Sequence, residues 1–150
     1  MASALDPEKI RELAKQLDDA IEKKAVEELV AYFSEACEVQ LPGRTLTGHR
    51  GLRKAISWMY SFIQLIKLAP VTILIKDDTF FEEFILKATI GGHDVELNQA
   101  EVLVYDGLYK VKSLRLYFDR LELAEFSPSN FFDRMLIRRV SKESLKGLEE

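Results

Sequence analysis

The stretch TFFEEFILKATIGGHDVELNQAEVLVYDGLYKVKSLRLYFD, residues 79–119, decides the fold that this sequence predicts. β-Branched and aromatic residues dominate it, and Gly91-Gly92 and Asp106-Gly107 interrupt it as turn signals. Strands separated by short glycine turns pair as neighbours and run antiparallel. The stretch therefore predicts a meander of three strands: Thr79–Ile90, His93–Tyr105 and Lys110–Asp119.

The Gly91-Gly92 loop determines which side chains of the first two strands share a face. With a two-residue loop, Ile90 pairs with His93, and Glu82 then lies directly opposite Glu101. The rest of that face is mostly apolar, so we expect it to be the concave side that helices cover. Its other members are Phe80, Phe84, Leu86, Leu97, Gln99 and Leu103.

The last strand has two possible registers against its neighbour. A two-residue turn at Asp106-Gly107 pairs Glu101 with Lys112, which offers the carboxylate a salt bridge. A four-residue loop pairs Glu101 with Leu114 instead. Both registers have the same parity, so in either case one further set joins the face of Glu101: Leu114, Leu116 and Phe118.

The first half of the chain is predicted to be mainly helical. Apolar residues recur at helical spacing in three segments, and Pro70 is expected to end this half before the strands begin. Helices followed by an antiparallel meander form an α+β layer fold. The predicted helices are Pro7–Ile21, Ala25–Glu35, Gly48–Ile63 and, after a breaker cluster at 127–130, Phe131–Val140; the additional strands are Cys37–Leu41, Thr45–Thr47 and Val71–Lys76.

The composition restricts the class of protein. The 150 residues, 47% hydrophobic and 31% charged, suit one domain over 1–150 whose C-terminal helix and tail span about 128–150. A net charge of -4 without a basic stripe argues against nucleic acid, and no apolar run reaches the length of a membrane helix. A single cysteine, Cys37, and an N-terminus without the apolar core of a signal peptide favour the cytoplasm.

Three stretches, Val26–Val39, Gly48–Ile56 and Glu101–Asp119, carry a family resemblance through their order and spacing. They resemble the nuclear-transport-factor-2-like superfamily, which includes ketosteroid isomerases and SnoaL-like polyketide cyclases. The resemblance covers roughly residues 8–125. It implies a cone of curved antiparallel sheet (a cystatin-like roll) whose N-terminal helices close an apolar pocket, often in a homodimer. This fold hosts many functions, so the site must decide the activity.

The resemblance assigns roles residue by residue. Glu101 falls where ketosteroid isomerases hold a protonated aspartic acid in the oxyanion hole. The catalytic base of those enzymes corresponds to Leu41 and their oxyanion-hole tyrosine to Leu17, while an aspartate of limonene epoxide hydrolases corresponds to Leu116. Leucine neither accepts nor donates a proton. An enzyme here would therefore be isomerase-, cyclase- or lyase-like, but not a standard ketosteroid isomerase or epoxide hydrolase.

Glu101 and Glu82 are the candidate catalytic residues. Two carboxylates ~5 Å apart repel by about 3 kcal/mol at an effective dielectric of ~20, so one stays protonated and is available as a general acid. The alternative is a solvated rim, or a salt bridge to Lys112 or Arg53. No metal or cofactor is expected. The candidate ligand-binding residues are Trp58, Phe62, Phe84, Gln99, Leu114, Leu116 and Phe118.

Two functions are consistent with this pattern. One is an enzyme that uses Glu101 on a small hydrophobic molecule, and the other is a non-catalytic ligand-binding or dimerisation module of the same fold. The opposite face of the strands is too apolar to be fully hydrated, which predicts a homodimer through it. That face carries Phe81, Ile85, Val102, Val104 and Tyr117.

Overall fold

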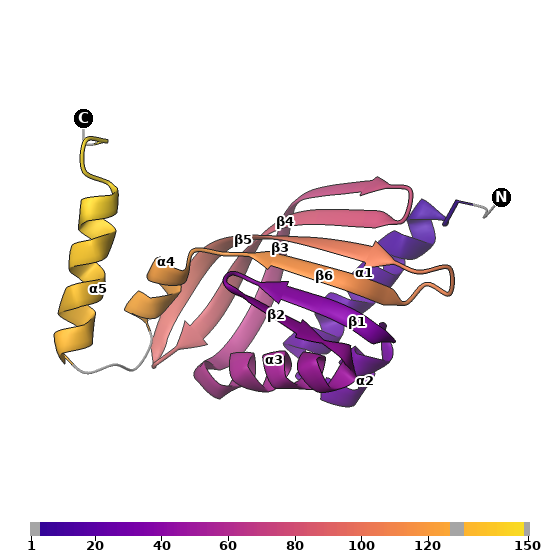
Figure 1. Ribbon diagram of the computed structural model, residues 1–150, viewed down its shortest axis with the longest axis horizontal. Coiled ribbons are helices and arrows are strands. Elements are labelled where there is room, and N and C mark those ends of the chain that lie inside the picture. The colour runs from indigo at the N-terminus through magenta and orange to yellow at the C-terminus, as the bar shows by residue number, and fades with distance from the viewer. Residues whose placement is uncertain (1–3, 127–130, 149–150) are drawn as a thin grey trace.

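The computed structural model describes residues 4–126 and 131–148 (Figure 1). Helices and strands are both present, and they follow one another in the order expected for an α+β fold. The helices are α1 (Pro7–Glu22), α2 (Val26–Ala31), α3 (Gly48–Phe62), α4 (Arg120–Glu125) and α5 (Phe131–Ser144). The strands are β1 (Phe33–Leu41), β2 (Arg44–Thr47), β3 (Ile63–Lys76), β4 (Thr79–Ile90), β5 (His93–Tyr105) and β6 (Val111–Tyr117).

The six strands form one curved, unclosed sheet in the order β2-β1-β6-β5-β4-β3. All neighbouring strands are antiparallel except β1 and β6, which run parallel. Helix α1 packs on β3 and β4, and α3 packs on β1, β2 and β3. Figure 1 shows α5 beside α4, away from the sheet. The predicted α+β fold is confirmed, with one parallel strand pair that the sequence did not indicate.

Helix α1 begins and packs as its sequence predicts. The Asp6 side chain caps it by accepting a hydrogen bond from the Glu8 amide at 3.0 Å, and Pro7 occupies the first helical position. One stripe of the helix is buried against the sheet, which sets the rotation of the helix about its axis. The buried residues are Ile10, Ala14, Leu17 and Ala20.

The central hairpin has the predicted register. Ile90 pairs with His93 and Glu82 pairs with Glu101. Gly91 and Gly92 have φ angles of 57° and 80°, the left-handed conformation that a two-residue turn of this hand requires. Buried side chains of this face, including those of Phe84 and Leu97, pack against α3, as predicted.

Two predicted boundaries in the first half are wrong. The second helix ends at Ala31 rather than Glu35, because the chain enters β1 at Phe33 and pairs there with β6. Pro70 does not end a helical segment, since β3 runs through it from Ile63 to Lys76 with a register shift beside the proline. An edge strand tolerates proline, because its outward side needs no amide donor.

Both predicted registers of the last strand are also wrong. Glu101 lies opposite Leu116, and the register shifts between Val104 and Tyr105. The intervening loop is longer than expected because Asp106 Oδ1 accepts hydrogen bonds from two loop amides, at 2.9 and 3.0 Å. The parity is nevertheless preserved, so Leu114 and Leu116 do share the face of Glu101.

The C-terminal helix extends to Ser144, four residues beyond the predicted end at Val140. The breaker cluster predicted at 127–130 lies outside the described residues. No helix within residues 4–126 and 131–148 is both long and apolar enough to span a membrane.

Candidate functional site

An inner pocket of about 110 Å³ lies between the sheet and helices α1 to α3. Its wall is almost wholly apolar. Besides the Trp58 indole, the polar side chains that line it belong to Gln99 and Glu101. Of the candidate ligand-binding residues, five reach this pocket: Trp58, Phe84, Gln99, Leu114 and Leu116.

Three leucines occupy this wall where the resemblance placed catalytic groups of other enzymes. Leu17 of α1, Leu41 of β1 and Leu116 of β6 all line the inner pocket together with Glu101. None of them can exchange a proton. Glu101 is therefore the one carboxyl group among the described residues that line this cavity.

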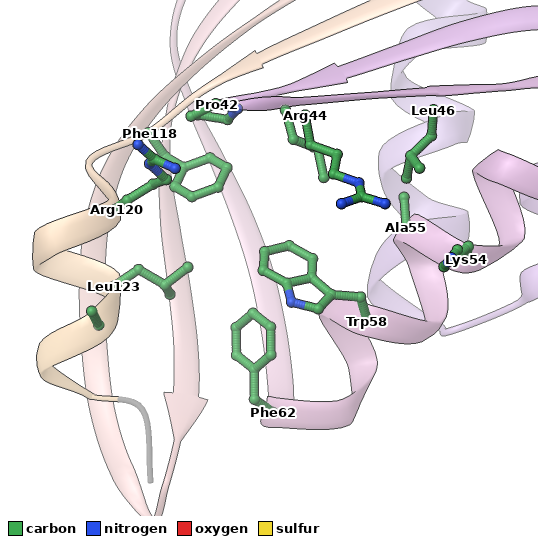
Figure 2. Close-up of a pocket in the computed structure, with 12 residues that line it drawn as sticks. Pro42, Arg44, Leu46, Lys54, Ala55, Trp58, Phe62, Phe118, Arg120 and Leu123 are labelled. Atoms are coloured by element: carbon green, nitrogen blue, oxygen red, sulfur yellow. The ribbon is translucent and has the colours of Figure 1, made fainter. Parts of the chain in front are cut away.

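A wider outer pocket of about 620 Å³ adjoins the inner one (Figure 2). The two share Leu41, Ala55 and Trp58 in their walls, so they lie next to each other. The remaining candidates, Phe62 and Phe118, lie here. Trp58 and Phe62 meet edge to face with their ring centroids 4.9 Å apart.

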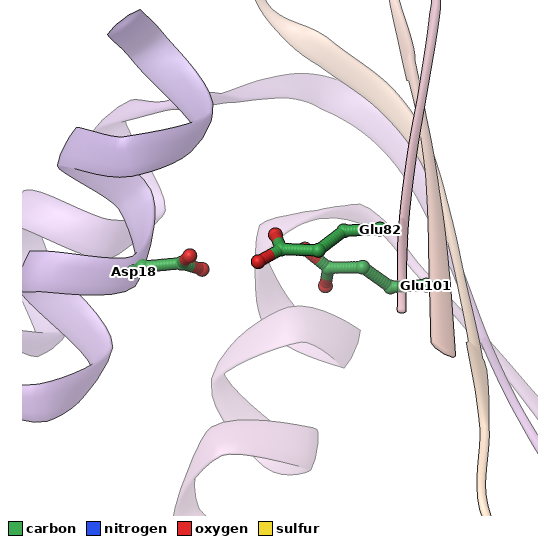
Figure 3. Close-up of side chains that lie close together, drawn as sticks. All are labelled: Asp18, Glu82 and Glu101. Atoms are coloured by element: carbon green, nitrogen blue, oxygen red, sulfur yellow. The ribbon is translucent and has the colours of Figure 1, made fainter. Parts of the chain in front are cut away.

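Three carboxyl groups meet behind the inner pocket (Figure 3). Glu82 and Glu101 are 1% and 5% exposed, and Asp18 of α1 points at them from the facing helix. One oxygen of each group lies within 4.8 Å of the others. The solvated rim is thus excluded, and so are the salt bridges, since Lys112 pairs with Asp78 and Arg53 with Glu27.

Burial and mutual repulsion favour the protonated forms of these groups. Burial, together with the charges of Glu82, Glu22 and Asp19, raises the pKa of Asp18 from 3.8 to about 8. Burial raises the pKa of Glu82 from 4.5 to about 7. Burial, then the charges of Asp18 and Glu82, raise the pKa of Glu101 well above its ordinary value. Burial and these neighbouring charges therefore favour the protonated, neutral form of Glu101.

The same three carboxyl groups offer one oxygen ligand each to a metal ion. Oxygen ligands of this kind suit Mg²⁺ or Ca²⁺. Oxygen Oε1 of Glu82 is buried and has no hydrogen-bond partner within the described part of the chain. Shared protons and a bound cation are alternative ways to neutralise the cluster. They predict opposite effects of the substitution Glu82→Gln on the stability of the protein.

Sequence reasoning missed two members of this region. Asp18 follows the buried Ala14 by four residues, a spacing that places it near the packed side of α1. When only its own helix is considered, however, a charged residue at this position is interpreted as exposed to solvent. Tyr105 follows Glu101 by four residues on the same strand face. Its buried hydroxyl has no partner among the described residues, and burial and the nearby charge of Glu101 raise its pKa.

Comparison with known proteins identifies the fold. No protein-family profile matches the sequence, and no curated protein does. Among solved structures, an NTF2-like protein of unknown function from Burkholderia pseudomallei matches with a TM-score of 0.74, at 14% identity over 80% of this chain and 98% of that one. Putative SnoaL-like polyketide cyclases from Shewanella species match as well.

Two further matches carry names that give an activity or a bound molecule. SalBIII, an epoxide hydrolase/cyclase-like enzyme in pyran ring formation, is 15% identical over 77% of this chain and 94% of that one, with a TM-score of 0.69. TerC, co-crystallised with polyporic acid, is 18% identical over 80% of this chain and 98% of that one, with a TM-score of 0.70. The chain therefore has the NTF2-like fold shared by SnoaL-like cyclases and ketosteroid isomerase-like proteins.

Proposed function

We propose that the chain binds a small hydrophobic molecule in the inner pocket and that Glu101 acts on it as a general acid. The observation that supports this most is a carboxyl group with a raised pKa that lines an almost wholly apolar cavity. In such a site a neutral acid donates a strong hydrogen bond to a ligand oxygen and stabilises the charge that develops there. The reaction class is isomerisation, ring closure or lyase-type cleavage.

The apolar wall limits how this chemistry proceeds. Leu41 and Leu17 supply no base or second acid, so the proton acceptor is water or another group of the ligand. Glu101 gives its proton to the ligand oxygen, and the acid is restored when that oxygen releases the proton. The Gln99 amide, on the same strand, serves to orient the ligand. The cyclase-like neighbours are consistent with this reaction class.

The test uses 2-decanone as a neutral hydrophobic ketone. Protonation of its oxygen by Glu101, with loss of a C3 hydrogen to water, gives the enol, and reversal in D₂O places deuterium at C3. We expect the protein to accelerate this exchange about 100-fold near pH 6. Glu101→Gln should bring the rate to background while leaving binding within about twofold, because an amide donates a hydrogen bond but transfers no proton. NMR measures the exchange.

Glu96→Gln is the matched control, because Glu96 lies on the same strand but is exposed and paired with Lys87. It should leave the exchange rate unchanged. If 2-decanone binds but the protein does not accelerate its exchange through Glu101, the result would support the second candidate, a non-catalytic binding module. That candidate is favoured because Leu17 and Leu41, which line the pocket, cannot accept a proton.

We also propose that this domain is cytoplasmic and forms a homodimer through the outer face of the sheet. Four residues of that face (Phe81, Ile85, Val102 and Val104) are half-buried, while Tyr117 is 55% exposed. Light scattering should give twice the mass of one chain, and Tyr117→Asp should shift the molecule toward the monomer. A monomer at high concentration would contradict this proposal.

A further inference from the structure

The outer pocket combines an aromatic floor with a cationic mouth. Its lining contains three aromatic rings, Trp58, Phe62 and Phe118 (the floor), and three cationic side chains, Arg44, Lys54 and Arg120 (the mouth); Figure 2 labels all six. Among the described residues that line this pocket, none is acidic. The chain as a whole has a net charge of -4, so this concentration of positive charge runs against the composition.

Three separate elements bring these cations together. Arg44 comes from β2, Lys54 from α3 and Arg120 from the first turn of α4. All three side chains are exposed, and none takes part in an ion pair among the described residues. Like charges that line one pocket without a partner repel, and an anion that binds in that pocket relieves the repulsion.

The guanidinium of Arg120 lies close to the turn between β1 and β2. A Cβ atom at Gly43 would lie 2.7 Å from Nη1 of Arg120, and Gly43 has a φ of 79°, which favours glycine. The guanidinium therefore lies against the bare backbone of this turn. Arginine in this position presents a planar set of donors that suits carboxylate and phosphate oxygens.

The sizes of the two pockets indicate how a ligand is divided between them. The inner pocket, of about 110 Å³, accommodates only one end of a molecule, whereas the outer pocket, of about 620 Å³, accommodates the rest. Trp58 lies in the walls of both pockets, together with Leu41 and Ala55. A ligand with its oxygen at Glu101 would therefore have its far end among the cations.

The geometry points to an amphipathic organic anion as the ligand: an apolar body with an oxygen at Glu101 and an anionic head group, carboxylate or phosphate, bound by Arg44, Lys54 and Arg120. The inner half of this inference rests on the function proposed above. The cationic mouth adds to that function two properties of the ligand, its negative charge and its orientation in the pockets.

The experiment compares two probes that differ only at the far end, 2-decanone and 9-oxodecanoate. Trp58 is the only tryptophan of the chain and lines both pockets, so its fluorescence reports binding in either of them. At low ionic strength we expect 9-oxodecanoate to bind about tenfold more tightly than 2-decanone, because charge-assisted hydrogen bonds form at the mouth. About 0.5 M NaCl should remove most of this advantage, since screening weakens exposed charge pairs.

Substitution of the cations should remove the same advantage. Arg44→Gln, Lys54→Gln and Arg120→Gln should each weaken 9-oxodecanoate binding severalfold and leave 2-decanone binding unchanged. Lys76→Gln is the control, because Lys76 is exposed at the end of β3 and does not line the outer pocket. Thermal melting of each variant verifies that it is folded. Comparing the affinities of 9-oxodecyl phosphate and 9-oxodecanoate shows whether the site prefers a phosphate or a carboxylate head group.

The outcomes separate this inference from the proposed function. If 2-decanone binds and the carboxylate of 9-oxodecanoate does not increase the affinity, the inference is wrong while the proposed function stands. If the advantage persists in all three variants or in high salt, the cations are not the binding group, and the inference again fails. If neither probe changes the fluorescence of Trp58 or releases heat in calorimetry, both proposals fail.

Discussion

At about pH 9, Glu82→Gln is expected to raise the free energy of unfolding by about 3 kcal/mol. The rise of the Glu82 pKa from 4.5 to about 7 means that ionising this buried group in the folded protein costs about that much. Glutamine has the same shape and remains neutral. The measurement is urea unfolding of both proteins at several pH values.

The direction of the pH dependence follows from the raised pKa values. The unfolded chain releases these protons near pH 4, whereas the folded chain retains them until about pH 7 at Glu82 and about pH 8 at Asp18. The folded state thus binds more protons over this interval, and its stability falls as pH rises through it. We expect the unfolding free energy of the wild type to decline between about pH 5 and 9, and the benefit of Glu82→Gln to vanish near pH 4.

Glu83→Gln is the matched control for this prediction. Glu83 is the next residue on β4, but it is exposed on the opposite face of the sheet. Its substitution should change stability little at any pH. A divalent cation held by the three carboxylates would reverse the sign: Glu82→Gln would then destabilise the protein, and Mg²⁺, Ca²⁺ or Mn²⁺ would raise the Tm of the wild type alone.

The sequence predicted the sheet best where local turn chemistry fixes the pairing. Gly91-Gly92 has one favoured geometry, and the register of β4 on β5 follows from it. The register of β6 on β5 was not predictable in the same way, because the Asp106 side chain stabilises a longer loop between these strands. Pro70 misled for a different reason: whether a strand tolerates proline depends on its place at the sheet edge, and that place is set by the complete fold.

The candidate site was predictable only as far as neighbouring strands define it. The pairing of Glu82 with Glu101 follows from the hairpin, and both side chains are buried on the face expected to be covered. Asp18 belongs to a helix more than sixty residues earlier in the chain. Its approach depends on the rotation and position of α1 on the sheet, which no local sequence pattern specifies. The pair of carboxyl groups could therefore be predicted from the sequence, whereas the third, Asp18, joins them only through tertiary packing.

The double variant Asp18→Asn/Glu82→Gln is expected to move the high-pH limit of Glu101-dependent exchange to lower pH. Once Asp18 and Glu82 ionise, their charges add to the effect of burial and keep Glu101 protonated. Without those charges Glu101 loses its proton earlier, and an ionised Glu101 is no longer an acid. We expect the exchange of 2-decanone to fall at the alkaline end of its pH profile, with little change near pH 5.

This pH profile separates an electrostatic role of Asp18 and Glu82 from a merely structural one. A structural role would lower the rate equally at every pH, whereas an electrostatic role lowers it only where the two groups are charged in the wild type. Because burial is the largest cause of the raised Glu101 pKa, the limit should move without disappearing. An unchanged limit in a folded double variant would mean that burial alone sets the acidity of Glu101, and that α1 contributes Asp18 to packing and not to the chemistry of the pocket.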